Sequence, residues 1–165
     1  MKKIVFATLA VALSTGTAFA ASGNSSTDTG AATAEVVQPI VLTHTPGAAL
    51  NFGKFTAGTG GTVSVSAAGT GTPGSDVAFV PGSTTAADAF TVAGDKNRTF
   101  AISTLGSSVS NGATSMNFTT AASAATGTLD NTGAAAFSVG GVLTVASGQA
   151  AGVYNGTYSA TVTYN

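Results

Sequence analysis

Polar and apolar residues alternate along short segments of the chain, which is the pattern of β-strands with one buried face. The clearest alternating pairs of apolar residues are Phe90/Val92, Phe100/Ile102, Met116/Phe118 and Phe137/Val139. Clusters of Gly, Pro, Asn and Asp separate these segments at intervals of roughly ten residues, and no segment has a convincing helical period. The pattern therefore predicts an all-β domain built as a sandwich.

The same pattern predicts the individual strands. They are expected at residues 32–43, 50–55, 61–66, 76–80, 89–92, 99–103, 115–119, 136–139, 142–146 and 154–164. We expect a turn at Gly140-Gly141 and a loop over residues 121–125. In the last segment, alternate residues would face the core: Tyr158, Ala160, Val162 and Tyr164. We expect this segment to lie in the middle of a sheet, because an exposed strand edge is a template for aggregation.

The first 20 residues have the features of a secretory signal peptide of bacterial type. Lys2 and Lys3 give a positive start, residues 4–13 are apolar, and Ala18-Phe19-Ala20 is a small-residue cleavage site. We therefore expect a signal peptide at 1–20, an N-terminal extension at 21–38 and one β-sandwich domain at 39–165. No further apolar run is long enough to cross a bilayer, so we expect no stable membrane insertion.

A proline interrupts the first predicted strand, at Pro39 in the segment A-A-T-A-E-V-V-Q-P-I-V-L-T. Proline is not expected within a continuous β-ladder. The segment is therefore interpreted as two strands, 31–37 and 40–45, which serve different sheets or different molecules. The alternative is that the whole segment is the first strand of a complete sandwich.

Charged residues make up only 7% of the chain. Outside the first 20 residues there are three basic and six acidic side chains, which leaves a net charge of −3. Nucleic-acid binding needs a basic stripe, so we expect no nucleic-acid partner. The chain has no cysteine, so its domain must be held together by its core, its hydrogen bonds or its partners.

Candidate catalytic and metal-binding residues are few. His44 is the single histidine, and we interpret it as a surface or turn residue and not as a catalytic base. No Cys, His or carboxylate cluster has the spacing of a zinc site. Asp95 and Asp130 lie in predicted turns, where turn geometry explains an aspartate better than calcium does. We expect no enzyme activity, no metal and no cofactor.

Both ends of the predicted domain resemble a known family. The N-terminal run T-G-A-A-T-A-E-V-V-Q-P-I-V-L-T is followed by L-N-F-G, and the chain ends in A-A-G-V-Y-N-G-T-Y-S-A-T-V-T-Y-N. Over residues 29–52 and 150–165 the chain resembles subunits of chaperone–usher fimbriae. The likeness is greatest to the capsular-antigen type and to Gly/Thr-rich fimbria-like secreted proteins.

The resemblance implies an incomplete immunoglobulin-like sandwich that is completed by donor-strand exchange. The inserting side chains would be Ala32, Ala34 and Val36. By the same resemblance, the acceptor groove and chaperone contact would be formed by Ile40, Leu42, Tyr158, Ala160, Val162 and Tyr164. The implied partners are identical subunits, a periplasmic chaperone and an outer-membrane usher, and the implied location is a cell-surface fimbria of a Gram-negative bacterium.

A second function class remains open, a stand-alone secreted carbohydrate-binding or adhesin domain. Such domains commonly place clustered Trp and Tyr side chains on one face, and this chain has no Trp.

Overall fold

The computed structural model describes residues 23–112 and 114–165. The predicted signal peptide, 1–20, lies outside the described residues. The chain divides into two compact units, the second of which spans Val36–Asn165. In the first unit, residues 23–35 have neither helix nor strand, and their side chains are exposed. All the strands described below belong to the second unit.

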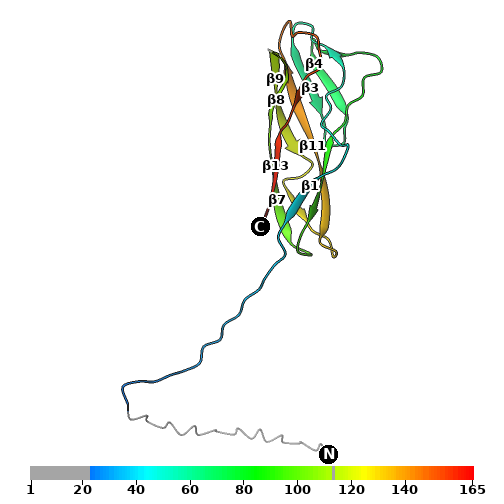
Figure 1. Ribbon diagram of the computed structural model, residues 1–165. Coiled ribbons are helices and arrows are strands. Elements are labelled where there is room, and N and C mark those ends of the chain that lie inside the picture. Colours follow the sequence, from blue (N-terminus) through cyan, green and yellow to red (C-terminus); the bar gives the residue numbers. More distant parts are fainter. Residues whose placement is uncertain (1–22, 113) are drawn as a thin grey trace, which may run out of the picture. The chain divides into compact units, whose positions relative to one another are not determined.

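Thirteen strands and no helix are described in the second unit, which Figure 1 shows as a ribbon. The strands of its first half are β1 (Val41–His44), β2 (Phe55–Thr56), β3 (Gly61–Val65), β4 (Gly71–Ser75), β5 (Ala78–Phe79) and β6 (Asp88–Ala93). Those of its second half are β7 (Thr99–Leu105), β8 (Ser107–Asn111), β9 (Thr114–Ala122), β10 (Thr126–Thr128), β11 (Ala134–Val145), β12 (Asn155–Gly156) and β13 (Ser159–Tyr164).

The strands form one large curled antiparallel sheet and two smaller sheets. The large sheet has the order β1-β6-β11-β9-β8-β12, and β3 joins β11 to β4. The smaller sheets are β10-β7-β13 and β2-β5. The long strand β11 organises the large sheet, because it pairs with β6 through its first half and with β3 through its second half.

One layer of the sandwich combines the pair β7–β13 of a smaller sheet with the pair β8–β12 at the end of the large sheet. Gly106 alone separates β7 from β8, and their partners β13 and β12 are separated only by Thr157 and Tyr158. The pair β7–β13 therefore continues directly into the pair β8–β12. A Cβ atom at Gly106 would overlap the carbonyl oxygen of Phe118, so this position needs glycine for the close approach of β9.

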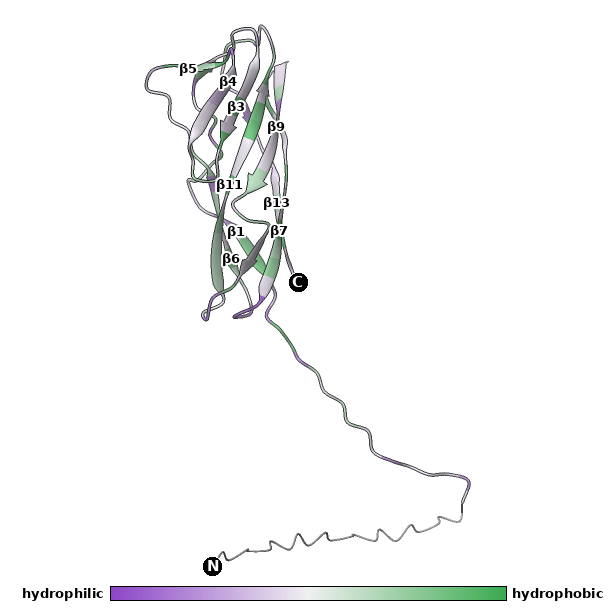
Figure 2. Ribbon diagram, turned by 180° about the vertical axis from the view of Figure 1, so that it is seen from behind, coloured by the Kyte–Doolittle hydropathy of each residue, from purple (hydrophilic) through white to green (hydrophobic). Residues whose placement is uncertain are grey.

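The core between the layers consists of two hydrophobic clusters. The first contains Phe52, Val63, Val65, Val77, Met116, Phe118, Leu143 and Val145. The second contains Phe90, Val92, Phe100, Leu129, Phe137 and Val139. Tyr158 packs against both clusters. Figure 2 shows hydrophobic stretches on β6 and β7, which contribute Phe90, Val92 and Phe100 to the second cluster.

The predicted all-β, sandwich-like fold is confirmed, and so is the inward orientation of the alternating pairs. Phe90, Val92, Phe118 and Val139, for example, are all buried. The prediction missed three strands, β4, β8 and β10, whose sequences are rich in Gly, Ser and Thr and contain few large apolar residues.

Two predicted connections are wrong. Gly140-Gly141 is not a turn but lies within β11, and residues 121–122 belong to β9 and not to a loop. A Cβ atom at Gly140 would overlap the carbonyl oxygen of Val65, and one at Gly141 would overlap that of Thr119. The two glycines therefore permit close strand packing in the middle of a sheet.

The predicted central position of the last strand is also wrong. Among the described residues, β13 pairs only with β7, which places it at the edge of its sheet. Its side chains do alternate as predicted, since Ala160, Val162 and Tyr164 are half-buried and the residues between them are exposed.

The core model predicts the effect of shortening one side chain on β11. Val139→Ala removes two methyl groups from a fully buried position and should lower the free energy of unfolding by about 2 kcal/mol. Val142→Ala makes the same change three residues away at a position that is 38% exposed, and should cost less than about 0.5 kcal/mol. Guanidinium unfolding of both variants measures the difference, and equal losses would contradict the assignment of the core.

Candidate functional site

The first and last strands of the sandwich each have one edge without a backbone partner among the described residues. β1 pairs with β6 alone, and β13 pairs with β7 alone. The two strands lie close together but exchange no ladder hydrogen bond. An unpaired strand edge exposes a row of N–H and C=O groups that can bind a further strand. Here two such edges border the same gap.

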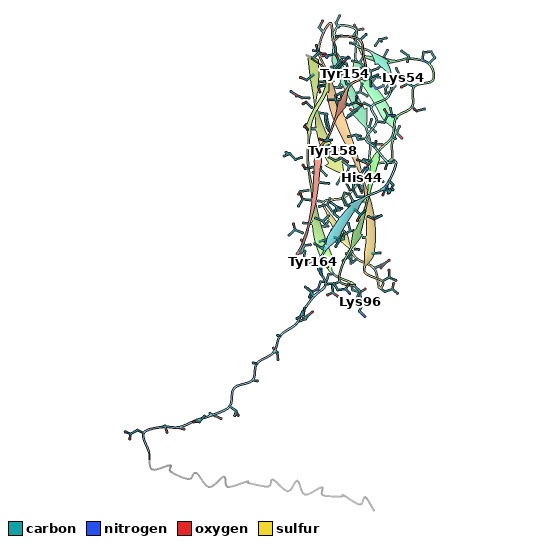
Figure 3. The ribbon with its side chains drawn as sticks, viewed as in Figure 1. His44, Lys54, Lys96, Tyr154, Tyr158 and Tyr164 are labelled. Atoms are coloured by element: carbon teal, nitrogen blue, oxygen red, sulfur yellow. The ribbon has the colours of Figure 1, made fainter. Side chains whose placement is uncertain are left out.

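β1 and β13 run in opposite directions along this gap. At one end, the hydroxyl group of Tyr164 donates a hydrogen bond of 3.0 Å to the carbonyl oxygen of Gln38, just before β1. It also accepts a hydrogen bond of 2.6 Å from the backbone N–H of Asp95. At the other end, His44 closes β1 and lies beside Tyr158, just before β13 (Figure 3).

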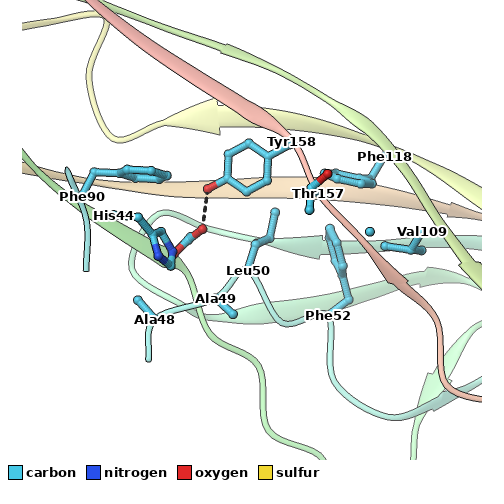
Figure 4. Close-up of a pocket in the computed structure, with 12 residues that line it drawn as sticks. His44, Ala48, Ala49, Leu50, Phe52, Phe90, Val109, Phe118, Thr157 and Tyr158 are labelled. Atoms are coloured by element: carbon cyan, nitrogen blue, oxygen red, sulfur yellow. Dashed lines mark hydrogen bonds and ion pairs between the residues drawn. The ribbon is translucent and has the colours of Figure 1, made fainter. Parts of the chain in front are cut away.

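A cleft of about 380 Å³ opens beyond that second end (Figure 4). Its volume lies at the lower end of the range for ligand pockets, about 300–1,000 Å³. One side is formed by the segment that follows β1, and the other side by the β12–β13 connection. The lining residues are His44, Ala48, Ala49, Leu50, Phe52, Asp88, Phe90, Val109, Phe118, Gly156, Thr157 and Tyr158. Most of this lining is apolar; the exceptions are Thr157 and one polar group at the end next to His44.

The polar group is centred on the carboxylate of Asp88, which is only 4% exposed. The hydroxyl group of Tyr158 donates a hydrogen bond of 2.7 Å to Oδ2 of Asp88. Nε2 of His44 lies 2.7 Å from Oδ1, which also accepts the backbone N–H of Ala89 at 2.8 Å. We call the side chains of His44, Asp88 and Tyr158 the Asp88 clasp, because they join β1, β6 and the start of β13.

The rings of the Asp88 clasp are held by aromatic packing as well. His44 meets Phe90 edge-on at 5.2 Å between ring centroids. Tyr158 meets Phe90 at 6.3 Å and Phe118 at 6.2 Å, both nearly perpendicular. Such contacts favour one ring orientation. Burial raises the pKa of Tyr158 above its ordinary value, and the hydrogen bond to the Asp88 carboxylate raises it further.

The six residues expected to form an acceptor groove lie together in the structure. Each packs against the second core cluster: Ile40, Leu42, Tyr158, Ala160, Val162 and Tyr164. Of these, only Tyr158 lines the open cleft. The others lie on or next to β1 and β13, toward the hydrogen bond from Tyr164 to Gln38.

The expected donor residues lie at the boundary of the two units. Ala32 and Ala34 belong to the first unit, and Val36 begins the second with a side chain that is 97% exposed. Residues 31–37 form no strand within this chain. They are therefore not paired as the first strand of a closed sandwich in this structure.

Sequence reasoning missed Asp88 and treated His44 as an ordinary surface residue. The side chain of His44 is 47% exposed, but it reaches a buried carboxylate. Asp88 is separated from His44 by 44 residues and from Tyr158 by 70 residues, so no local spacing reveals the contact. One signal was available: Asp88 continues the inward alternation of Phe90 and Val92, which predicts a buried carboxylate.

The turn at Asp130 has the predicted geometry. Oδ1 of Asp130 accepts hydrogen bonds from the hydroxyl and backbone N–H of Thr132 and from the N–H of Ala134. The hydroxyl of Thr132 is the main cause of a lowered pKa of Asp130, and the N–H of Ala134 lowers it further.

Two other kinds of site were searched for in the described residues. Within residues 23–112 and 114–165, no three His, Cys, Asp or Glu side chains are placed to hold a metal ion. The same part of the chain contains no helix with the length and apolar character to cross a membrane.

Comparison with protein families matches residues 42–164 to the family described as "Domain of unknown function (DUF4402)". The chain belongs to this family. Comparison with curated proteins and with solved structures found no similar protein. The DUF4402 match begins in β1 and ends at the last residue of β13, so it contains the whole cleft and the Asp88 clasp. It leaves the segment 31–37 outside.

In this DUF4402 domain, removal of one hydroxyl group tests the Asp88 clasp. Tyr158→Phe leaves Oδ2 of the buried Asp88 without its hydrogen-bond donor and should lower the free energy of unfolding by about 1–3 kcal/mol. Tyr154→Phe is the matched control, because the partners of its hydroxyl group, Thr114, Gln149 and Ala150, include no charged group. A similar decrease in the free energy of unfolding in the two variants would show that the hydrogen bond to Asp88 stabilises the domain no more than an ordinary tyrosine hydrogen bond does.

The raised pKa of Tyr158 predicts how stability depends on alkaline pH. Above the ordinary tyrosine pKa of about 10, the unfolded chain releases this proton while the folded domain retains it. The free energy of unfolding should therefore fall as pH rises from 10, and Tyr158→Phe should remove part of this slope. Unfolding measured between pH 8 and pH 11 tests it; an unchanged slope in the variant contradicts the assignment.

Proposed function

We propose that this protein is a structural subunit of an extracellular bacterial fibre, and that it polymerises head to tail. Each subunit would place its segment 31–37 as an additional strand between β1 and β13 of the next subunit. The observation that supports this most directly is the pair of strand edges beside a largely apolar cleft, together with a segment before the sandwich that forms no strand within this chain.

Strand addition fits the chemistry of this gap. A seven-residue segment inserted there would form main-chain hydrogen bonds with β1 on one side and β13 on the other. The Cα atoms of these strands approach within 8 Å, and a strand between them needs about twice the 4.7–4.9 Å spacing of neighbouring strands, so insertion would move β1 and β13 apart. Its alternate side chains, Ala32, Ala34 and Val36, would face the core, and Thr33 and Glu35 would face solvent. Such a contact joins two different surfaces of identical subunits, so it propagates as a filament.

Slow release is part of the proposal. The gain from hydrogen bonds and apolar burial is offset by the cost of association and of ordering the segment. The inserted strand would lie over residues that pack against the second core cluster, such as Leu42 and Val162. Its release would therefore require opening of that core, which makes the polymer kinetically stable.

The proposal includes the route to the fibre that the fimbrial resemblance implies. The subunit would pass through the periplasm of a Gram-negative bacterium, where a chaperone would occupy the gap until an usher exchanges it for a second subunit. The family match to DUF4402 names no function and is compatible with this route. Adhesion and biofilm support would follow at the cell surface.

The alternative of a stand-alone carbohydrate-binding domain has less support. Carbohydrate rings commonly stack on exposed aromatic side chains. Among the described residues, every Phe and Tyr is buried or half-buried. The apolar cleft between two strand edges suits a peptide strand better than a sugar.

Changes in the segment 31–37 test the proposal. Val36→Asp would place a charge in an apolar site and should abolish fibres, whereas Thr33→Asp places the same residue on the opposite face and should preserve them. Electron microscopy of the cell surface and SDS-resistant ladders from unboiled samples measure assembly. Polymers like those of the wild type from Val36→Asp, or from a chain lacking residues 23–37, would refute the donor assignment.

A further inference from the structure

The gap between β1 and β13 is not uniform along its length. The Asp88 clasp lies at one end of it, next to the cleft, where the rings of His44 and Tyr158 project from the two sides and meet at one buried carboxylate. Beyond the clasp lies the cleft, whose lining includes the apolar side chains of Leu50, Phe52 and Val109. Figure 4 shows the bond from Tyr158 to Asp88 at one end of this cleft and Phe52 and Val109 at the other.

Hydrogen bonds and ring contacts hold the side chains of the Asp88 clasp in one arrangement. Asp88 accepts three hydrogen bonds of 2.7–2.8 Å, and the two rings are packed against Phe90. Neither ring can turn aside without breaking a bond to a buried carboxylate, which is costly. A side chain of an inserted strand that packs against the clasp therefore cannot displace the two rings. A methyl group fits there more easily than a branched side chain.

In the segment before the sandwich, the side chains on one face increase in size toward its C-terminal end, which matches the position of the cleft beyond the clasp. Its residues on one face are Gly30, Ala32, Ala34 and Val36, so the only branched side chain comes last. Successive residues on one face of a strand are separated by about 6.6–6.8 Å. If Val36 occupies the cleft, Ala34 falls next to the clasp and Ala32 falls over Leu42 and Ala160.

We propose that the Asp88 clasp sets the register of the incoming strand, with Ala34 of one subunit held against His44 and Tyr158 of the next and Val36 in the cleft beyond them. This inference rests on the polymer proposed above and adds to it a fixed register and direction. The clasp acts as a size filter: only a small side chain such as that of Ala34 fits against it, so the larger side chain of Val36 must lie in the cleft.

The same placement fixes the direction of the strand. With Val36 at the cleft and Ala32 nearer Tyr164, the incoming strand runs antiparallel to β13. Its continuation, Gln38 and Pro39, then leaves at the cleft end of the acceptor. The acceptor's own Gln38 is bonded to Tyr164 at the opposite end, so the incoming segment and the acceptor's own segment would leave the acceptor domain at opposite ends.

The reverse direction fits the observed space less well. It would place Val36 near Val162 and Tyr164, where the Tyr164 hydroxyl already bonds to Gln38 and Asp95. The cleft would receive only Gly30 or Ala32, which leaves most of its volume unfilled. An unfilled apolar cavity loses packing contacts, so this arrangement is disfavoured.

Disulfide cross-linking of the full chain tests the register, because the native chain has no cysteine. Paired substitutions Val36→Cys/Leu50→Cys and Ala32→Cys/Ala160→Cys should each give covalent ladders on oxidation, visible in boiled, non-reducing gels. The mismatched pair Val36→Cys/Ala160→Cys should give none, because in this register the two residues are separated by about two same-face positions of the strand, which is too far for a disulfide.

The outcomes separate this inference from the proposed function. Absence of polymers from the wild-type chain would overturn both. Polymers of the wild-type kind that cross-link through the mismatched pair, or through neither matched pair, would overturn the register and leave strand addition in place. Cross-links through both matched pairs alone support the inference.

The size filter has its own test in the full chain. Ala34→Val adds two methyl groups above the clasp and should reduce the yield of polymer about tenfold or more. Thr33→Val introduces the same residue on the solvent face and should change the yield less than about twofold. Equal yields from Ala34→Val and the wild type would show that the clasp selects nothing.

Discussion

The structure depends on backbone groups that have no partner at the gap between β1 and β13. Of the other described strands with five residues or more, β4 alone also pairs on one side only. Tyr158, which lies beside this gap, packs against both core clusters. The chain has no disulfide and few charges with which to compensate. Its layers are held together by apolar packing and by strand ladders, so an open edge is a weakness of the fold unless another strand covers it.

The Asp88 clasp shows why an apolar domain retains a buried carboxylate. Burial of a charge is costly unless hydrogen bonds replace the lost water. Asp88 receives such bonds from its neighbour Ala89 and from two distant parts of the chain, the end of β1 and the residue before β13. Directional bonds specify one spacing between the layers, which apolar contacts do not do.

Alternation in the sequence predicted the fold class and the inward side chains well, because period-two patterns report burial directly. Prediction from the sequence failed where the same local composition is compatible with two different structures. Gly140-Gly141 has the composition of a turn, yet neighbouring carbonyl groups on both sides require glycine within β11. The clasp was missed because His44, Asp88 and Tyr158 meet only through the topology of the sheets. The six residues expected in an acceptor groove pack against one core cluster because they occupy alternating positions on or next to β1 and β13.

The last strand was expected at the centre of a sheet because an exposed edge invites aggregation, and that reasoning still applies now that β13 is known to be an edge. Natural edge strands are protected by charged residues, proline or bulges. β1 reads V-L-T-H and β13 reads S-A-T-V-T-Y, so neither strand contains a lysine, a carboxylate or a proline. Two unprotected edges on one gap are a hazard for a monomer and a requirement for a subunit that is completed by strand addition. The lack of protection therefore favours a dedicated occupant over a gap that stays empty.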